Sequence, residues 1–397
     1  MALNAHLQLA LQLFAWLIAL AWLWKAISSA RGFGQIPNLT TPAFDRTPPN
    51  NPTLTVIVPA CNEQTAVRSC IDSLLSQDYP NLHIIAIDDR STDRTPQILD
   101  DLSATHPQRL TVFHIADLPS GWLGKTHAMA LAARHAIAVH SPDWILFTDA
   151  DILFHPEAIR RSLVAAELDR ADHFVTLPTA LIRSLPEGMV MGFLQVLGLW
   201  ATRLWRVSDH GTRDAVGIGA FNLIRTPAYT HIGGFDRLRM EILDDLTLAR
   251  RVKEAGLRQR CALAPNYVSI HWAVGARGIT RGMTKNLFAL FRFHTSFLLL
   301  TCAWLTVVCI GPFAAVFWSS TRTPALLILL AIASMYRTTG RFSGIPLVNF
   351  FFFPFATALF IYSLLRSAIV TLKNGGIEWR GTFYPLPELR RNSGRPV

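Results

Sequence analysis

Charged residues are scarce in this 397-residue sequence, at 16% against the roughly 25% of ordinary soluble domains. Hydrophobic residues make up 51%, and the apolar excess is concentrated toward the two ends of the chain. This distribution argues against a wholly soluble protein. It predicts a soluble central domain that lies, in the sequence, between membrane segments.

Cysteine is sparse as well, and its pattern contains no pairing signal. The five cysteines are an odd number, and no two of them form a CxxC pair. Two of them, Cys302 and Cys309, fall in an apolar run. The pattern argues against a disulfide framework or a zinc site and predicts reduced thiols that act as small hydrophobic residues.

Lysine accounts for only five of the 37 basic residues, and the formal net charge is +10. A basic protein can bind nucleic acid, anionic lipid or a diphosphate. Because the sequence contains no recognisable nucleic-acid-binding module, we expect no nucleic-acid partner. A positive surface facing an anionic bilayer fits the hydrophobic ends better.

The first apolar run, residues 7–24, is uncharged and just long enough to span a bilayer. A cleaved signal peptide is the alternative, because Ser28 and Ala30 are small residues at a cleavage-like spacing. No Lys or Arg precedes the run, however, while Lys25 and Arg31 follow it. This charge bias favours a membrane anchor and a cytoplasmic position for the domain that follows.

The whole chain is predicted to have six parts. They are an N-terminal membrane anchor at 1–31, a Gly- and Pro-containing linker at 32–52, an α/β domain at 53–273, an interfacial basic and aromatic segment at 274–295, a C-terminal membrane region at 296–372 and a basic tail at 373–397. Residues 185–205 either dip into the membrane or line an acceptor groove, or they form a buried core helix.

The number of membrane crossings in the C-terminal membrane region determines on which side of the membrane the basic tail lies. Residues 296–318 and 346–372 suit membrane helices, whereas the apolar run at 324–336 is short for a crossing. Three crossings would place the basic tail outside, against the positive-inside tendency. Two crossings plus a re-entrant or interfacial segment would keep it inside, and this arrangement is favoured.

Between residues 54 and 151 the sequence alternates between strand and helix patterns. Strands are expected at 54–60, 83–89, 109–115 and 143–151, with helices at 65–77, 94–104 and 126–139. Such alternation predicts an open α/β sheet of parallel strands joined by right-handed crossovers. Ligands bind such sheets at the carboxyl ends of the strands.

Acidic residues follow three of these strands. Asp149 and Asp151 end the fourth in a DxD pattern that can hold a hard divalent ion, although two solvated loop aspartates would look the same. Asn62-Glu63 follow the first strand and Asp88-Asp89 end the second, where an acidic residue can accept hydrogen bonds from a base or ribose.

Phosphate binding has to rely on other groups, because no Gly-rich phosphate loop of the Rossmann or Walker type is present. Lys125, beside two glycines in GWLGKTHA, is one candidate cation, with a plain surface lysine as the alternative. Asp244 and Asp245 begin an amphipathic helix. They act either as helix-capping residues or as a general base for an acceptor hydroxyl.

In order, the segments VIVPACNE, IDDRSTD, GWLGKTHA, TDAD, GGFD and LDDLTLARRVKEAG resemble the family 2 glycosyltransferases with the GT-A fold, over about residues 54–270. The resemblance implies inverting transfer from a nucleotide-diphosphate sugar, usually a UDP-sugar, with Mg2+ or Mn2+. It implies that Asp151 ligates the metal with Asp149 beside it, and that Asp245 is the base with Asp244 in the preceding acidic position. It implies a donor-binding set of Pro59, Ala60, Asn62, Glu63, Asp88, Asp89, Lys125 and Asp149.

The resemblance extends to a smaller group within this family. Three features carry it: the membrane segments, residues 282–288 and the tail at 376–386. They look like those of bacterial cytoplasmic-membrane enzymes that glycosylate isoprenoid, carotenoid, hopanoid or sphingoid lipids, which implies a lipid acceptor. The QxxRW motif of processive synthases and ceramide enzymes is absent after His271-Trp272. Arg281 or Lys285 is a candidate for the missing cation near the diphosphate.

Two other functional classes remain open on the sequence alone. A nucleotidyltransferase would share the sheet and the metal-binding carboxylates. It would be expected to carry a basic Gly-rich loop after the first strand, where this sequence has PACNE. A catalytically inactive membrane scaffold would keep the fold for binding, and the intact set of aspartates argues against it.

Overall fold

The computed structural model describes residues 2–271 and 275–392, and the chain divides into two compact units. We call one the helical unit and the other the α/β unit. Their segments are Met1–Gln35, Ile182–Arg203 and Trp272–Ile377 for the helical unit, and Ile36–Leu181, Leu204–His271 and Glu378–Val397 for the α/β unit. The predicted domain boundary at 273/274, Trp272 and Arg395 lie outside the described residues.

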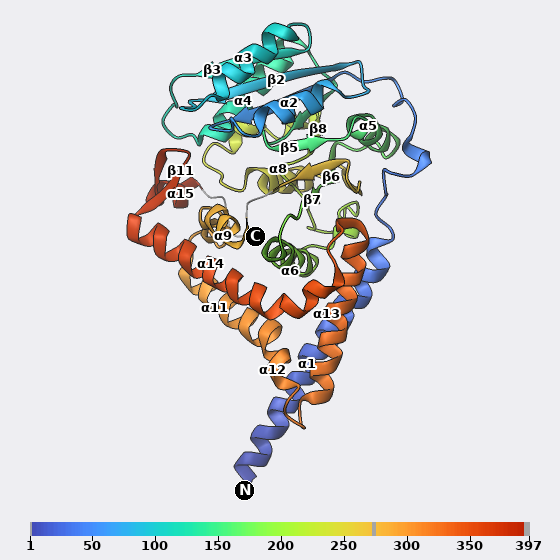
Figure 1. Cartoon of the computed structure of the whole chain (residues 1–397), viewed down its shortest axis with the longest axis vertical. Coiled ribbons are helices and arrows are strands. Elements are labelled where there is room, and N and C mark those ends of the chain that lie inside the picture. The colour runs from blue at the N-terminus through green and yellow to red at the C-terminus, as the bar shows by residue number, and fades with distance from the viewer. Residues whose placement is uncertain (1, 272–274, 393–397) are drawn as a thin grey trace. The chain divides into compact units, whose positions relative to one another are not determined.

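A seven-stranded sheet forms the centre of the α/β unit, in the order β3-β2-β1-β4-β8-β6-β9 (Figure 1). The strands are β1 Leu54–Ala60, β2 Leu82–Asp89, β3 Leu110–Ile115, β4 Trp144–Phe147, β6 His173–Leu177, β8 Asn222–Arg225 and β9 Gln259–Leu263. The first four pair in parallel, as predicted, which confirms the α/β class. The strand β8 runs antiparallel to β4 and β6, a reversal that the sequence pattern did not reveal.

Helices cover both faces of this sheet, and the alternation of side chains along β1 shows how. Val56 and Val58 pack with α2 (Val67–Leu75), α3 (Thr95–Thr105) and α5 (Ala158–Leu168). Ile57 points to the other face, where it packs with α4 (Gly124–Val139) and α8 (Asp244–Glu254). Every residue of β1 is buried, as expected for a central parallel strand.

Smaller elements complete the α/β unit. They are the sheet of β5 Ile152–Phe154, β10 Val268–Ile270 and β7 Thr179–Ala180, the hairpin of β11 Gly376–Trp379 and β12 Thr382–Pro385, and the helices α7 Thr226–His231 and α15 Leu386–Asn392. The described part of the predicted basic tail, residues 373–392, is therefore folded. From Glu378 onward it belongs to the α/β unit.

Eight α-helices and a π-helical segment, Thr306–Ile310, are described in the helical unit. The helices are α1 Ala2–Phe33, α6 Leu185–Ala201, α9 Gly275–Thr284, α10 Leu287–Leu290, α11 Thr295–Leu305, α12 Gly311–Ala315, α13 Arg322–Ser343 and α14 Phe353–Asn374. In the described part of the chain, three stretches are long and apolar enough to cross a membrane: His6–Phe33, Thr295–Ala315 and Leu347–Asn374. They overlap the predicted runs at 7–24, 296–318 and 346–372.

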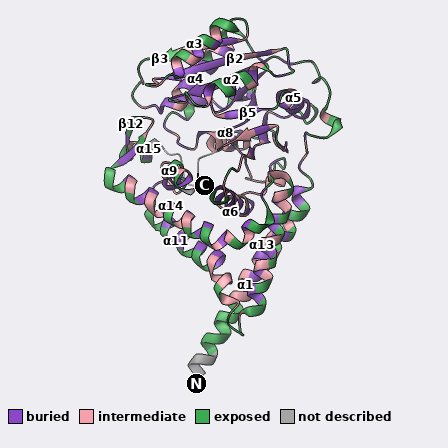
Figure 2. Cartoon of the chain, in the orientation of Figure 1, coloured by how far each residue is buried: buried purple, intermediate pink, exposed green. Residues whose placement is uncertain are grey.

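The surface of α1 suits a lipid environment. Leu7, Leu13, Leu17 and Leu20 are each at least 60% exposed, and exposed positions continue along the helix in Figure 2. Trp22, on the inner side, is 1% exposed, and its Nε1 donates to the carbonyl oxygen of Val308 at 3.1 Å. A soluble protein rarely exposes so long an apolar face, so these contacts agree with a membrane anchor.

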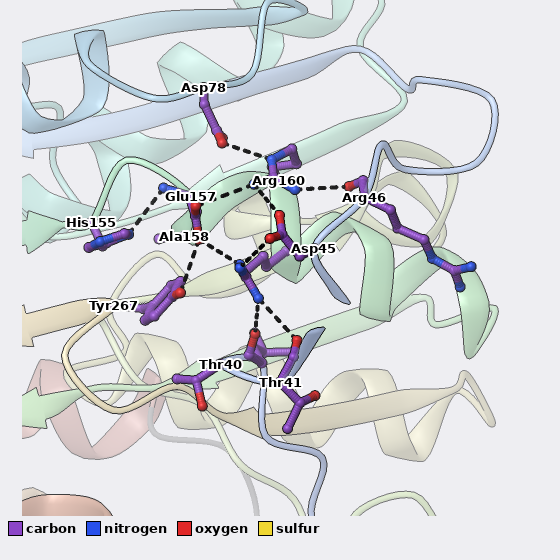
Figure 3. A network of polar contacts seen from close by, with 12 residues as sticks. Thr40, Thr41, Asp45, Arg46, Asp78, His155, Glu157, Ala158, Arg160 and Tyr267 are labelled. Carbon is purple, nitrogen blue, oxygen red and sulfur yellow. Dashed lines mark hydrogen bonds and ion pairs between the residues drawn. The ribbon is translucent and has the colours of Figure 1, made fainter. Parts of the chain in front are cut away.

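Residues of the predicted linker are held to α5 by a buried arginine. The guanidinium of Arg161 donates to the carbonyl oxygens of Leu39 and Thr41, both at 3.0 Å. It also pairs with Asp45 at 3.1 Å and with Glu157 at 2.7 Å. Figure 3 shows the surrounding contacts, in which Arg160 joins the same Asp45 to Asp78.

Replacing Arg161 with Met should destabilise the α/β unit, because the buried carbonyl group of Leu39, the carbonyl group of Thr41 and the carboxylate of Glu157 lose a charged donor. The expected loss is about 3 kcal/mol, which corresponds to roughly 6 to 12 °C in Tm. Arg46→Ala is the matched control, since only its backbone carbonyl, which accepts from Arg160, joins this network. Thermal unfolding of the detergent-solubilised protein measures both, and equal Tm values for the two variants would contradict the stated role.

Candidate active site

The candidate site lies where the parallel strands end. Ala60 is the last residue of β1 and is in register with Asp88 of β2. Asp149 and Asp151 follow the end of β4 at Phe147. The predicted residues Pro59 and Ala60 are buried within β1, so their contribution to this edge is backbone and shape.

Lys125 brings three of the predicted residues together. Its Nζ lies 2.8 Å from Oδ1 of Asp149 and 3.3 Å from Oδ2 of Asp244. Lys125 comes from the start of α4, Asp149 from the turn after β4 and Asp244 from the start of α8. Asp245 follows directly, and its Oδ1 accepts the Leu246 N–H at 2.7 Å.

Burial and mutual repulsion change the acidity of this cluster. Burial, followed by the charge of Asp244, raises the pKa of Asp245 to about 7. Burial and the charge of Asp149 raise the pKa of Asp151 to about 6. Burial alone would lower the pKa of Lys125, but the surrounding aspartates outweigh it and raise that pKa above its usual value. Asp245 is thus poised to accept a proton near neutral pH.

Two glycines allow the loop before β8 to approach these carboxylates. A Cβ on Gly219 would lie 2.3 Å from Oδ2 of Asp149, and the Gly219 carbonyl accepts the Asp149 N–H at 3.0 Å. A Cβ on Gly217 would lie 2.0 Å from the backbone oxygen of Asp245. Gly217 and Gly219 therefore permit a close approach that a side chain at either position would block.

Asp88 and Asp89 are both engaged by basic groups. The Arg90 guanidinium holds both oxygens of Asp89, at 2.8 Å and 3.3 Å. Asp88 Oδ1 accepts the Ser91 N–H, and its Oδ2 lies 3.3 Å from Nδ1 of His114. Both aspartates are nearly inaccessible, with Asp89 1% exposed.

Asn62 and Glu63 tie the loop after β1 to its neighbours. The backbone of Asn62 is left-handed, with φ of 58°, a conformation that Asn tolerates better than most residues. Its Oδ1 accepts the Thr92 N–H at 2.8 Å. Glu63 Oε1 lies 3.1 Å from Nη2 of Arg380 in the C-terminal tail.

The tail residues were missed as site residues by sequence reasoning. Arg380 contacts Glu63, Thr382 Oγ1 accepts from Nη1 of Arg90 at 3.1 Å, and the Tyr384 hydroxyl accepts the Gly124 N–H at 3.2 Å. A cavity of about 380 Å³ is lined by the hairpin, by Arg90 and by residues 116–122. The one available signal was the WRG sequence at the hairpin turn, which had no assigned role.

Arg281 and Lys285, the candidate cations named from the sequence, belong to the helical unit. Their predicted role near the diphosphate stays a prediction.

Asp149 and Asp151 fit a hard divalent ion. Both supply carboxylate oxygens, and the repulsion that raises the pKa of Asp151 would be relieved by a cation. Among the described residues no group of three or more His, Cys, Asp or Glu could hold a metal alone. This pattern suits Mg2+ or Mn2+, which are often held by one or two carboxylates and completed by substrate phosphates.

Replacing Lys125 with Met should make stability depend on pH. Without the ammonium the pKa values of the buried carboxyls rise further, so the folded state binds extra protons and loses stability as the pH rises. The Tm deficit of the variant in EDTA should therefore widen between pH 5 and pH 8. The expected size is about 1.4 kcal/mol, or roughly 3 to 5 °C, for each unit of added pKa shift.

Lys253→Met is the matched control, because its Nζ donates to two backbone carbonyl oxygens, those of Val207 and Asp209. A Tm deficit for Lys125→Met that stays constant across this pH range would show that the ammonium does not neutralise the cluster.

Comparison with known proteins agrees with this geometry. Residues 55–220 match the sequence model described as Glycosyl transferase family 2. The chain is similar to 4,4'-diaponeurosporenoate glycosyltransferases of Staphylococcus aureus. It shares 22% identity over 352 residues with the protein of strain bovine RF122 / ET3-1, a match covering 85% of this chain and 89% of the relative. The USA300 protein shares 23% over 355 residues with the same coverage.

A solved structure has the same fold. A mannosyltransferase from Pyrobaculum calidifontis, in complex with GDP-Man and Mn2+, aligns with a TM-score of 0.53 and 18% identity. The alignment covers 92% of this chain and 98% of that one.

Proposed function

Because this chain is a family 2 glycosyltransferase, we propose that it transfers a sugar from a nucleotide-diphosphate sugar to an isoprenoid-type membrane lipid. The observation that carries the proposal is the cluster of Asp149, Lys125, Asp244 and Asp245 at the strand ends. It supplies a base and carboxylates suited to a metal in one place. The expected donor is a UDP-sugar, and the mannosyltransferase structure with GDP-Man keeps GDP-sugars in the set to be tested.

The reaction is a single displacement. The acceptor oxygen attacks the anomeric carbon, the bond from that carbon to the diphosphate breaks, and the diphosphate leaves with the electron pair. The acceptor proton passes to the carboxylate of Asp245, whose pKa of about 7 makes it a usable base at neutral pH. Attack opposite the leaving group inverts the anomeric centre.

Mg2+ or Mn2+ held at Asp149 and Asp151 would neutralise the charge that develops on the departing diphosphate. The ammonium group of Lys125 pairs with the carboxylate of Asp149. It also pairs with Asp244, and its charge lowers the pKa values of Asp244 and Asp245 against the burial that raises both.

The membrane segments explain how such an acceptor would be reached. Moving a lipid chain out of the bilayer costs about 0.8 kcal/mol for each exposed CH₂ group, so a site held at the membrane face removes that cost. The relatives named for a carotenoid acid support a lipid acceptor. Lys25 and Arg31, which follow the first span, support a cytoplasmic catalytic domain.

Asp245→Asn should lower kcat about 10²-fold or more while donor affinity is retained, because the amide cannot accept the proton.

Asp151→Asn should raise the Mn2+ concentration needed for activity, because a metal ligand loses its charge. The measurement is transfer of labelled sugar into the lipid phase, with UDP-, GDP- and TDP-sugars, Mn2+ and a bacterial lipid extract. Asp101→Asn, an exposed change on α3, is the control.

Wild-type activity that survives unchanged in Asp245→Asn would remove that residue from the base role. Binding of a nucleotide sugar without transfer or hydrolysis under every condition would favour the inactive scaffold.

A further inference from the structure

We infer that the C-terminal tail supplies a donor-binding residue: Arg380 binds the diphosphate of the nucleotide sugar. This inference rests on the proposed function and adds to it a cation that no sequence motif identified. The first observation is the position of the residue at the turn of the β11–β12 hairpin, where it reaches Glu63 beyond the end of β1.

The backbone at this turn indicates a specific use of the arginine. Arg380 and Gly381 have φ values of 52° and 75°, the pattern of a two-residue turn that favours Asn-Gly or Gly-Gly. A left-handed arginine costs about 1 to 2 kcal/mol relative to glycine. A long cationic side chain at a position that prefers a small residue points to a function for the side chain.

The hydrogen-bonding capacity of the Arg380 guanidinium is incompletely used. Nη2 pairs with Glu63 at 3.1 Å, whereas Nη1 is buried and has no hydrogen-bond partner among the described residues. A buried guanidinium N–H without a partner is costly, and an anionic oxygen is the ligand that satisfies it best. The donor diphosphate is the anion that the proposed reaction brings to this edge of the sheet.

The charge of Arg380 also acts on the proposed metal ligands. It lowers the pKa of Asp151, opposing the burial that raises it, and it lowers that of Glu63 in the same way. Lys125, the other candidate cation here, already pairs with Asp149 and Asp244.

Two further contacts hold the hairpin at the donor site. Arg90, which grips Asp89, donates to Thr382, and the first backbone N–H of α4 donates to Tyr384. Glu63 holds Arg380 when no donor is bound, and the diphosphate takes up Nη1 when it enters.

The test is nucleotide binding by the full-length, detergent-purified protein, measured by calorimetry with UDP, GDP and TDP and with the matching nucleosides. Arg380→Ala should weaken nucleoside diphosphate binding at least about tenfold in EDTA, where no metal compensates, and leave nucleoside binding unchanged. Arg380→Lys should recover part of the affinity. Arg391→Ala, an exposed change in the same tail, should bind like wild type.

Equal diphosphate affinity for wild type and Arg380→Ala would overturn the inference and leave the proposed function intact. Equal loss of nucleoside and diphosphate binding would also overturn it, since the arginine would then only shape the site. If wild type bound no nucleoside diphosphate with or without Mn2+, the proposed function itself would fail.

A second, independent observation concerns the membrane segments. The geometry of the helical unit points to α13 as a helix that crosses the membrane and to α14 as a helix that lies at the membrane surface. The rings of Phe33 and Phe342, near the ends of α1 and α13, are 5.6 Å apart. At the opposite ends, Leu11 of α1 lines one cavity with Trp318 and Thr321, just before α13. The two helices thus run parallel over the same length, so α13 crosses wherever α1 crosses.

Chain connectivity then constrains α14. Phe33 is followed within three residues by the α/β unit, so the C-terminal end of α13 is on that side of the membrane. Asn374, at the end of α14, is followed within four residues by Glu378 of the α/β unit. The first residue of α14, Phe353, follows the end of α13 at Ser343 by ten residues, and its ring lies 6.2 Å from that of Trp22 in α1. Both ends of α14 are thus placed on one side, and the helix lies along the membrane surface although its composition suits a span.

The side chains of α14 agree with this position. Phe355, Tyr362 and Ile369 recur every seven residues and are 57–67% exposed, so they form one apolar stripe. The helix packs against α6 and α9 within the helical unit. An apolar stripe on a surface-lying helix inserts into the headgroup and acyl boundary of a bilayer.

Single cysteines probed with an impermeant maleimide test this topology, since all five native cysteines are buried. Ala104→Cys reports the side of the α/β unit in inside-out and right-side-out vesicles. Arg341→Cys, near the end of α13, should label in the same vesicles as Ala104→Cys, and Ser320→Cys in the opposite ones. Labelling of Arg341→Cys from the opposite side, or its protection in both, would overturn the assignment.

Discussion

The ammonium group of Lys125 neutralises carboxylates from two different elements, and the arrangement of the strand ends depends on that charge. Asp149 and Asp244 both contact this group. Its charge also lowers the pKa values of Asp245 and Asp151, against the burial that raises them. Like charges this close repel strongly where water is excluded. Because α4, the turn after β4 and α8 each contribute one partner, the same charge balance that sets the acidity of Asp245 also holds three chain segments together. The glycines at 217 and 219 let a fourth segment approach.

Sequence alone predicted the first half of the α/β unit well, because its signals are local. Buried strands such as Leu54–Ala60 are continuous apolar runs, and the acidic motifs mark where they end. The antiparallel β8 was not predicted, since strand direction in the sheet depends on pairing with β4 and β6. The contact between Glu63 and Arg380 joins residues 317 positions apart, and nothing in the local pattern of the tail reveals such a partner. The roles assigned to individual site residues remain predictions.

Composition and packing give different accounts of the membrane segments. Hydropathy selects Leu347–Asn374 as a span and passes over α13, whose C-terminal part carries Arg337 and Arg341. A helix protected along its length by α1 needs less apolar surface than one surrounded by lipid, since part of it faces protein. Conversely, a helix at the membrane surface can be highly apolar when one side packs on protein and the other meets acyl chains. Length and hydropathy describe a segment in isolation, whereas its neighbours determine where it lies.

The docking of the tail also has a consequence for biosynthesis. Tyr384 contacts Gly124 across 260 residues, and the three candidate membrane spans found in the described residues are all translated before that tyrosine. The ribosome therefore completes the contacts of the β11–β12 hairpin within the α/β unit only after those three spans have been made. A chain truncated or stalled before the hairpin would carry the aspartate cluster without Arg380, Thr382 and Tyr384. The order of synthesis thus couples completion of the pocket to completion of the membrane-embedded part, so an unfinished chain is also an incomplete enzyme.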